Sequence, residues 1–139
     1  MRVDWAILCR YVEAGGGLAT LVSAGVDTYF VPELPGPVSL ILGVRVVASD
    51  EELAEPHQIA FRVLGPDLSE ISRLEGEFRL ETNPLKQPGW EGGGIFPSIQ
   101  TFEATEYGAH SLEISIDGRE LKSVPFGVRE PPEAESLAP

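Results

Sequence analysis

The sequence predicts an all-β domain, namely an antiparallel immunoglobulin-like β-sandwich of about seven to eight strands with Greek-key connections. Three observations support this prediction. Apolar and polar residues alternate along most of the chain, and no stretch longer than about two turns has helical spacing. The 139 residues include 15 Gly and 12 Pro, which indicates many turns between short strands. A small closed barrel is the alternative architecture, since it also joins short strands by tight turns.

The chain is expected to begin with two strands. The glycines at 15–17 end the first strand, because glycine readily adopts the positive φ of a tight turn. The second strand is predicted to run from Leu18 to Phe30, with Gly25 as a candidate β-bulge. One face of the first strand is expected to carry Val3, Trp5, Ile7, Cys9 and Tyr11.

The proline-rich segment 32–37 stops the second strand, because proline donates no backbone hydrogen bond, and it is predicted to form a crossing loop. A half-buried strand follows from Val38 to Ala48, with Arg45 pointing outward. Residues 49–56 are expected to form a single helical turn capped by Ser49. The residues of this strand that are predicted to face the core are Leu40, Leu42, Val44 and Val46.

Two further strands are predicted at His57–Leu64 and Arg73–Glu81, joined by a turn at 65–67, while residues 68–72 are ambiguous. Their inward residues are expected to be Ile59, Phe61, Val63, Leu74, Phe78 and Leu80. If the strands are neighbours, their outward charges form a lattice of cross-strand pairs, each worth about 0.2–1 kcal/mol. The lattice would consist of Arg45, Arg62, Arg79, Glu75, Glu77 and Glu81.

The segment from Asn83 to Gly94 is the longest irregular stretch inside the predicted domain. Its glycines at 92–94 are interpreted as turn residues, because the Lys-Ser/Thr of a phosphate loop does not follow them. Trp90 is the one residue there whose surroundings are unusual. Our preferred interpretation is a plug that folds back over the end of the sandwich, and the alternative is an exposed contact anchor.

The last strands are predicted at Ile95–Phe102, Ala109–Asp117 and Leu121–Val128, with Leu112, Ile114 and Ile116 facing inward. Asp117-Gly118 is a strong signal for a type I′ hairpin turn. Pro125 indicates an edge position for the final strand. The β-sandwich domain is expected to span residues 1–129, followed by an acidic, proline-rich tail at 130–139 that we expect to be disordered.

Four short motifs carry a resemblance to a known family. They are residues 108–118 (Gly-Ala-His-Ser-Leu-Glu-Ile-Ser-Ile-Asp-Gly), 124–128 (Val-Pro-Phe-Gly-Val), 6–12 (Ala-Ile-Leu-Cys-Arg-Tyr-Val) and 23–25 (Ser-Ala-Gly). They resemble a family of short, uncharacterised actinobacterial proteins, a domain of unknown function that looks like an immunoglobulin-type sandwich. The resemblance implies the fold and brings no activity with it. His110 stands where the family has an aromatic hydroxyl, and Tyr107 is the candidate to replace it.

The charge balance and the cysteine content exclude several classes of partner and compartment. The net charge of −12 repels phosphate backbones and anionic membrane surfaces, so we expect no nucleic acid and no membrane as a partner. The single Cys9 excludes an intrachain disulfide and favours a cytoplasmic location. Asp4 interrupts the short apolar run near the start, so no signal peptide or lipoprotein box is predicted.

No catalytic residue, cofactor or metal site is predicted from the sequence. The two histidines, His57 and His110, could form a zinc site only with carboxylates. We expect His57 to cap the start of a strand and His110 to fill a half-buried packing position with one satisfied nitrogen. The acids at 50–55 lack the alternation and the glycine of a calcium loop, so they are interpreted as a solvated acidic loop.

The function predicted from these features is a non-enzymatic protein-interaction module that binds another protein, by a loop end or an exposed edge strand. Its expected contact residues are Trp90, Glu91 and Tyr107. An alternative is a small-ligand or carbohydrate-binding domain that stacks its ligand on Trp90, Tyr107 or Tyr29. A weaker alternative is a self-assembling structural subunit.

Overall fold

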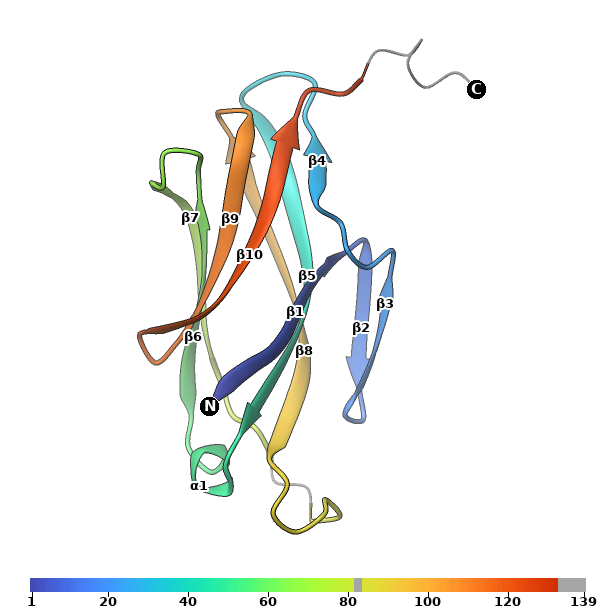
Figure 1. The fold of residues 1–139 in the computed structure, drawn as a ribbon, viewed down its shortest axis with the longest axis vertical. Helices are drawn as coiled ribbons and strands as arrows, with labels where there is room; N and C mark the ends of the chain where they lie inside the picture. Colours follow the sequence, from blue (N-terminus) through green and yellow to red (C-terminus); the bar gives the residue numbers. More distant parts are fainter. Residues whose placement is uncertain (82–83, 133–139) are drawn as a thin grey trace.

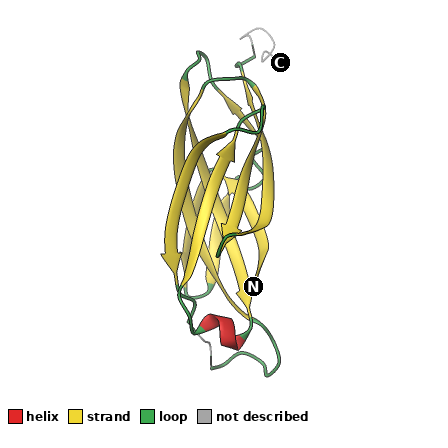
Figure 2. Cartoon of the chain, turned by 90° about the vertical axis from the view of Figure 1, so that its left-hand side faces the viewer, coloured by secondary structure: helices red, strands yellow, loops and turns green. Residues whose placement is uncertain are grey.

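The computed structural model describes residues 1–81 and 84–132, which form an all-β fold with one short helix, α1 (Asp50–Leu53) (Figures 1 and 2). Two sheets face each other across one hydrophobic core, and a separate hairpin lies beside them. The three-stranded sheet has the order β1 (Arg2–Cys9), β5 (Gly36–Ala48), β8 (Gly92–Ala104). The five-stranded sheet has the order β4 (Thr28–Phe30), β10 (Arg119–Arg129), β9 (Gly108–Ile116), β6 (His57–Leu64), β7 (Glu70–Phe78). The hairpin consists of β2 (Tyr11–Gly15) and β3 (Leu18–Val22).

The core lies between β5 on one side and β6, β9 and β10 on the other. The alternation predicted for β5, β6 and β9 is confirmed, because their inward side chains are all buried in one cluster. These side chains are Leu40, Leu42, Val44, Val46, Ile59, Phe61, Val63, Leu112, Ile114 and Ile116. In the described part of the chain, no helix has the length and apolar character needed to cross a membrane.

The alternation predicted for β1 fails at a β-bulge. The register of β1 against β5 shifts between Val3 and Trp5. A bulge inserts one extra residue, so every later side chain changes to the opposite face. Leu8 therefore joins Val3 in the core, while Ile7 is only partly buried. The single face predicted for Val3, Trp5, Ile7, Cys9 and Tyr11 is wrong beyond the bulge.

The strand predicted over Leu18–Phe30 is two separate strands. β3 ends at Val22, and the connection to β4 contains Ser23 and Gly25 with φ of 53° and 93°. Left-handed backbone at these positions turns the chain out of the hairpin, so Gly25 is a turn residue and no bulge. β4 then runs parallel to the end of β10, with Thr28 opposite Gly127. The break between β3 and β4 was not predicted, although its cause is local, and the pairing of β4 with β10 joins segments far apart in sequence.

β7 is the last strand of the five-stranded sheet, and this position explains where predicted burial fails. Leu74 lies opposite the buried Phe61 and shares its face, yet Leu74 is 39% exposed. An edge strand has a neighbour on one side only, which leaves its core-facing side chains partly uncovered. The strand predicted over Arg73–Glu81 lies earlier, at 70–78, and Leu80 is buried in the segment after it.

The predicted charge lattice does not form as expected: in the described residues, ion pairs at β6 and β7 involve Glu70 and Arg73, which were not in the prediction, and Arg79 and Glu81 lie after the end of β7. Arg62 and Arg73 lie opposite each other, and both pair with Glu70, at 2.7 and 2.9 Å. Arg45 lies in the other sheet, where its guanidinium pairs with Asp4. The prediction that Arg45 shares this face is therefore wrong, because β5 and β6 belong to different sheets.

The glycines at 92–94 begin β8, so their interpretation as turn residues is wrong. A Cβ on Gly92 would lie 2.5 Å from Leu53 Cδ1, and a Cβ on Gly94 would lie 2.5 Å from Leu80 Cδ2. Strand glycine at these positions permits a close approach of neighbouring side chains. The strand predicted from Ile95 therefore starts three residues earlier.

The C-terminal hairpin follows the prediction closely. Asp117 and Gly118 both have positive φ, 51° and 80°, as a type I′ turn requires. β10 pairs with β4 only at 127–129, so Pro125 lies where β10 is the edge of the sheet, as predicted. Residues 130–132 form no strand, and the rest of the predicted tail, 133–139, lies outside the described residues.

Candidate functional site

The end of the fold that carries α1 combines an exposed tryptophan with a buried polar cluster, and we call it the α1 end. It comprises α1, the loop 84–91 and the turn at 117–118; α1 and the loop lie at the bottom of Figure 1, and the β9–β10 turn lies higher at the left. α1 begins at Ser49, as predicted, through a reciprocal capping box with Glu52. Leu53 is the one buried residue of the helix and packs against the start of β8.

The loop 84–91 is tied to the rest of the domain at two points. Lys86 Nζ donates a hydrogen bond to the backbone oxygen of Trp90 at 2.5 Å and pairs with Asp50 of α1 at 3.2 Å. Arg2 of β1 pairs with Glu91 at 3.0 Å. These contacts fix the backbone on both sides of the tryptophan relative to two different elements.

Trp90 itself projects into solvent. It is 69% exposed, and Leu85 in the same loop is 88% exposed. The preferred prediction that Trp90 folds back as a plug is wrong, because the loop is positioned by Lys86 and Glu91 rather than by the indole ring. The indole is therefore exposed on a loop whose backbone is held by other residues.

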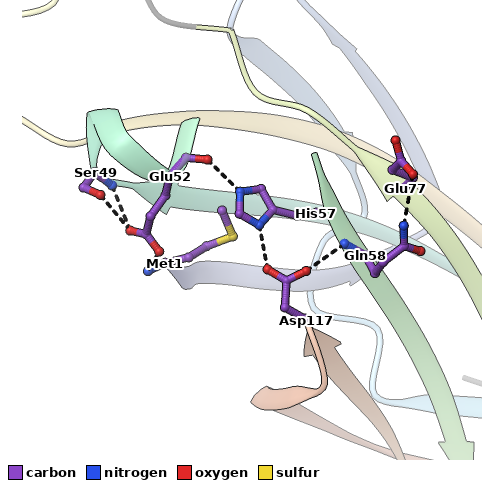
Figure 3. A network of polar contacts seen from close by, with 7 residues as sticks. All are labelled: Met1, Ser49, Glu52, His57, Gln58, Glu77 and Asp117. Atoms are coloured by element: carbon purple, nitrogen blue, oxygen red, sulfur yellow. Dashed lines mark hydrogen bonds and ion pairs between the residues drawn. The ribbon is translucent and has the colours of Figure 1, made fainter. Parts of the chain in front are cut away.

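Beneath this surface, His57 lies in a cluster of polar contacts that joins four elements (Figure 3). His57 is the first residue of β6 and is only 7% exposed. Its Nδ1 lies 2.6 Å from Asp117 Oδ2, and its Nε2 lies 2.6 Å from the backbone oxygen of Glu52. Asp117 also accepts a hydrogen bond from the Gln58 backbone N–H at 3.0 Å. The ring therefore links α1 to the β9–β10 turn.

These contacts determine the charge of the ring. Both facing atoms are oxygens that can only accept, so both ring nitrogens of His57 must carry a proton. The Glu52 carbonyl and then the Asp117 carboxylate raise the pKa of His57, against the opposing effect of burial. The same contact with His57 lowers the pKa of Asp117. The pair is an imidazolium and a carboxylate.

Glu52 forms a second ion pair in the same cluster. Its Oε2 lies 2.7 Å from the Met1 ammonium, and its Oε1 accepts hydrogen bonds from the Ser49 backbone N–H and hydroxyl at 3.1 and 3.0 Å. The ammonium, followed by the two Ser49 donors, lowers the pKa of Glu52 to about 2. The helix is thus held by an ion pair on its side chain and by His57 on its backbone.

Both ring nitrogens of His57 face protein oxygens in this structure. An Asp-His pair acts as a general base when the second ring nitrogen faces a reacting group, but Nε2 of His57 faces a backbone carbonyl. The described residues also contain no group of three or more metal-ligating side chains. The contacts of the cluster join α1 to β6, to the β9–β10 turn and to Met1.

Tyr107, the third predicted contact residue, lies at the other end of the molecule. β8 separates it from Trp90 and Glu91 by 13 residues, or about 40 Å at about 3.3 Å per residue. Its hydroxyl donates a hydrogen bond to the Val31 backbone oxygen at 2.7 Å. Tyr107 therefore makes a hydrogen bond between distant segments, as we expected of a residue that replaces the aromatic hydroxyl absent at His110.

The aromatic residues near Tyr107 are engaged in packing. The Tyr29 ring meets Phe126 edge to face at 5.6 Å, and burial raises the pKa of Tyr29 to about 12. His110 is almost fully buried, stacked on Phe126, with Nδ1 3.0 Å from the Gly108 backbone oxygen. A groove of about 870 Å³ beside them is lined by Tyr107, His110 and Phe126 together with smaller residues and a few charged ones. Tyr29 is not available to stack on a ligand.

Sequence patterns did not reveal two polar pairs that the structure contains. His57 and Asp117 are 60 residues apart, and only the pairing of β6 with β9 brings them together. Glu113 is buried beside Glu120 and accepts a hydrogen bond from Ser123 Oγ at 2.9 Å. The hydrogen bond with Glu113 and the charge of that carboxylate raise the pKa of Glu120.

Comparison with known proteins identifies a family and gives no information about function. A family described as a family of unknown function, DUF6941, matches residues 4–129. No curated protein matches the chain. One similar solved structure is the Pseudomonas fluorescens alkylpurine DNA glycosylase AlkC bound to DNA containing an abasic site analog, with 9% identity and a TM-score of 0.37. The match covers 89% of this chain and 30% of that one, and a likeness this weak supports no conclusion about function.

Proposed function

The chain belongs to the DUF6941 family of unknown function, and from that premise we propose that it is a non-enzymatic module that binds another protein through the α1 end. The observation that carries this proposal is the exposure of Trp90 on a loop held by Lys86 and Glu91. Tryptophan is enriched among the residues that dominate binding energy at protein interfaces. A loop that is already positioned loses less conformational entropy when a partner binds.

The surface around Trp90 indicates the chemistry of the partner. Glu51 and Glu55 are exposed on α1 and the turn after it, and neither forms an ion pair in the described part of the chain. Glu91 directly follows Trp90. The whole chain carries a net charge of −12, which steers a basic surface toward it. We propose a protein partner with an apolar pocket for the indole and lysine or arginine side chains around that pocket.

The test is a binding measurement on a defined partner. Wild-type protein captures candidate partners from its native cells, and each purified candidate is titrated by calorimetry against wild type and Trp90→Ala. We expect Trp90→Ala to weaken binding by about 2 kcal/mol or more, roughly a factor of 30. Binding of the wild type should also weaken as salt is added, because the rim is acidic. Equal affinity of both proteins would overturn the proposal.

Ile99→Ala is the matched control for this experiment. Ile99 is 65% exposed on β8, outside the α1 end, so its loss removes a comparable apolar surface elsewhere. We expect wild-type affinity for this variant. A loss of affinity in Ile99→Ala with none in Trp90→Ala would place the contact surface on the sheet instead.

Three measurements address the other functional classes. In a Trp5→Phe background, Trp90 is the single tryptophan, and a change in its fluorescence during titration with glycans would favour a carbohydrate-binding module. Light scattering that shows a mass rising with concentration would favour a self-assembling subunit. Turnover of an ester, phosphate or glycoside that one substitution abolishes would contradict a non-enzymatic role.

We also propose that the fold is an immunoglobulin-like sandwich with Greek-key connections. β1, β5 and β8 in one sheet and β10, β9, β6 and β7 in the other correspond to the strand order of such domains. The parallel pairing of β4 with β10 supports this, since it places the early part of the chain in both sheets. Amide-to-Hα nuclear Overhauser contacts between 28–30 and 127–129 test it, and their absence would count against it.

The proposed location of the protein is the cytoplasm. Cys9 is buried and forms no disulfide, so nothing in its setting requires an oxidising compartment. Imaging of the chain fused to a fluorescent protein in its native cells tests this proposal, and fluorescence restricted to the envelope would contradict it.

A further inference from the structure

We propose that His57 is a proton-operated clamp, which holds α1 on the domain as an imidazolium and releases the α1 end when the proton is lost. The idea that this release regulates binding rests on the function proposed above. The clamp itself stands on the contacts of His57 and on the way α1 positions the loop 84–91.

The geometry requires two ring protons. A neutral imidazole has one N–H, so one of the two 2.6 Å contacts would become a lone pair facing an oxygen. The ring offers little surface to water, since His57 is only 7% exposed. A buried acceptor left against another acceptor is strongly unfavourable. Deprotonation must therefore break one of the contacts.

The contact that breaks is the one to α1. The Asp117 carboxylate is a charged acceptor and retains the remaining proton on Nδ1, because charge-assisted hydrogen bonds are about twice as strong as neutral ones. Nε2 then faces the Glu52 carbonyl without a proton. This carbonyl is in the last turn of a four-residue helix, where a cation is favourable and a lone pair is not.

The charges around the ring favour the protonated state. Asp117 faces it from the β9–β10 turn, and Glu55 faces it from the turn after α1. The Glu52 carboxylate lies on α1 and is neutralised by the Met1 ammonium at the start of the chain. From β7, the uncharged Phe78 ring packs at 5.6 Å. These surroundings raise the pKa of His57 above its ordinary value of 6.5, so the clamp opens on the alkaline side.

Release of α1 would affect the loop 84–91, because α1 contacts this loop and the start of β8. Asp50 of α1 pairs with Lys86, and Lys86 donates to the backbone oxygen of Trp90. Leu53 packs against Gly92, two residues after Trp90. A helix that separates from His57 therefore loosens the loop on both sides of the indole. With His57 deprotonated, Trp90 would adopt many orientations. Binding of a partner would then be weaker, because ordering the loop costs conformational entropy.

The test is an NMR titration of the whole chain between pH 5.5 and 9. Ring ¹⁵N shifts of His57 should show both nitrogens protonated at the acidic end and a midpoint above 6.5. Backbone amide shifts of α1 and of residues 84–91 should change with the same midpoint. Amides at the opposite end, such as Val31, should stay unchanged. One unprotonated ring nitrogen at pH 5.5, or α1 amides that ignore the titration of His57, would overturn the proposal.

Two variants separate the clamp from general pH effects. Asp117→Asn keeps the size of the side chain but removes its charge, so the midpoint at His57 and at α1 should fall together by about one pH unit or more. His110→Phe is the matched control, because it removes the other histidine, already stacked on Phe126, and should leave the response of α1 unchanged. A response of α1 that is unaltered in Asp117→Asn would contradict the clamp.

This experiment contains no binding partner, so its outcome is independent of the proposed function. If the titration behaves as expected and Trp90→Ala binds like wild type, the clamp is supported and the proposed interaction surface is contradicted. If Trp90→Ala loses binding while the amide shifts of α1 do not follow the protonation of His57, the interaction surface is supported and its regulation by His57 is contradicted.

Discussion

Leu53 and Gly92 are in direct contact, and the Leu53 side chain occupies the space where a Cβ at position 92 would lie, 2.5 Å from Leu53 Cδ1. Gly92→Ala should therefore destabilise the protein by about 1–3 kcal/mol, because the buried leucine has to shift. Urea denaturation measures the effect. Gly76→Ala is the control, since a Cβ there meets nothing within 4 Å, and its change should stay within about 0.5 kcal/mol.

Trp90→Ala should leave the free energy of unfolding within about 0.5 kcal/mol of wild type, because the indole is exposed. A buried plug would instead cost about 3 kcal/mol. Leu53→Ala at the same end provides the comparison, since this fully buried side chain should cost about 2–5 kcal/mol in the same denaturation experiment. A large loss in Trp90→Ala would mean that the side chain packs on the domain.

The Glu52 ion pair makes stability depend on acid pH. The pKa of the Glu52 carboxyl is about 2 in the folded protein, against an ordinary value of 4.5. The stabilisation by the ion pair is therefore fully present above pH 4.5 and is lost as the pH falls through about 2. We expect the urea midpoint of Glu52→Gln to change less than that of wild type between pH 6 and 3. Glu51→Gln, which lacks these contacts, should follow wild type. Parallel curves for Glu52→Gln and wild type would contradict the prediction.

Tyr107→Phe should destabilise the fold by about 1 kcal/mol. The hydroxyl donates to the backbone oxygen of the buried Val31, and its removal leaves that oxygen without this donor. Tyr11→Phe removes an exposed contact of 3.4 Å to Glu13 and should be neutral. Thermal unfolding of the two variants, measured side by side, shows whether the connection to Val31 contributes to stability.

Local sequence patterns predicted those parts of the fold that local physics determines. Alternation located β5, β6 and β9, because their core-facing side chains recur at every second residue. The cap at Ser49 and the turn at Asp117-Gly118 were predicted for the same reason, since each depends on residues within four positions. The bulge in β1 was not predictable, because it leaves the apolar composition of the strand unchanged.

The candidate site was predicted only in part because most of it is assembled by distant pairings. Trp90 and Glu91 were chosen for their unusual context, and both belong to the α1 end. Tyr107, the third predicted contact residue, lies at the opposite end, because β8 separates it from them and no local pattern in the sequence indicates this distance. His57 and Asp117 are 60 residues apart in the sequence, and no periodicity in the sequence predicts their contact.

The parallel contact of β4 with β10 has a consequence for how the chain folds during synthesis. Thr28 leaves the ribosome about a hundred residues before its partner Gly127. Until then β4 has no strand to pair with, and β9 exposes the edge that β10 later covers. A topology that closes through such distant segments folds slowly and leaves nascent strand edges available to other chains. Translation speed over the last strand and access to chaperones should therefore control the yield of this protein more strongly than substitutions on its surface.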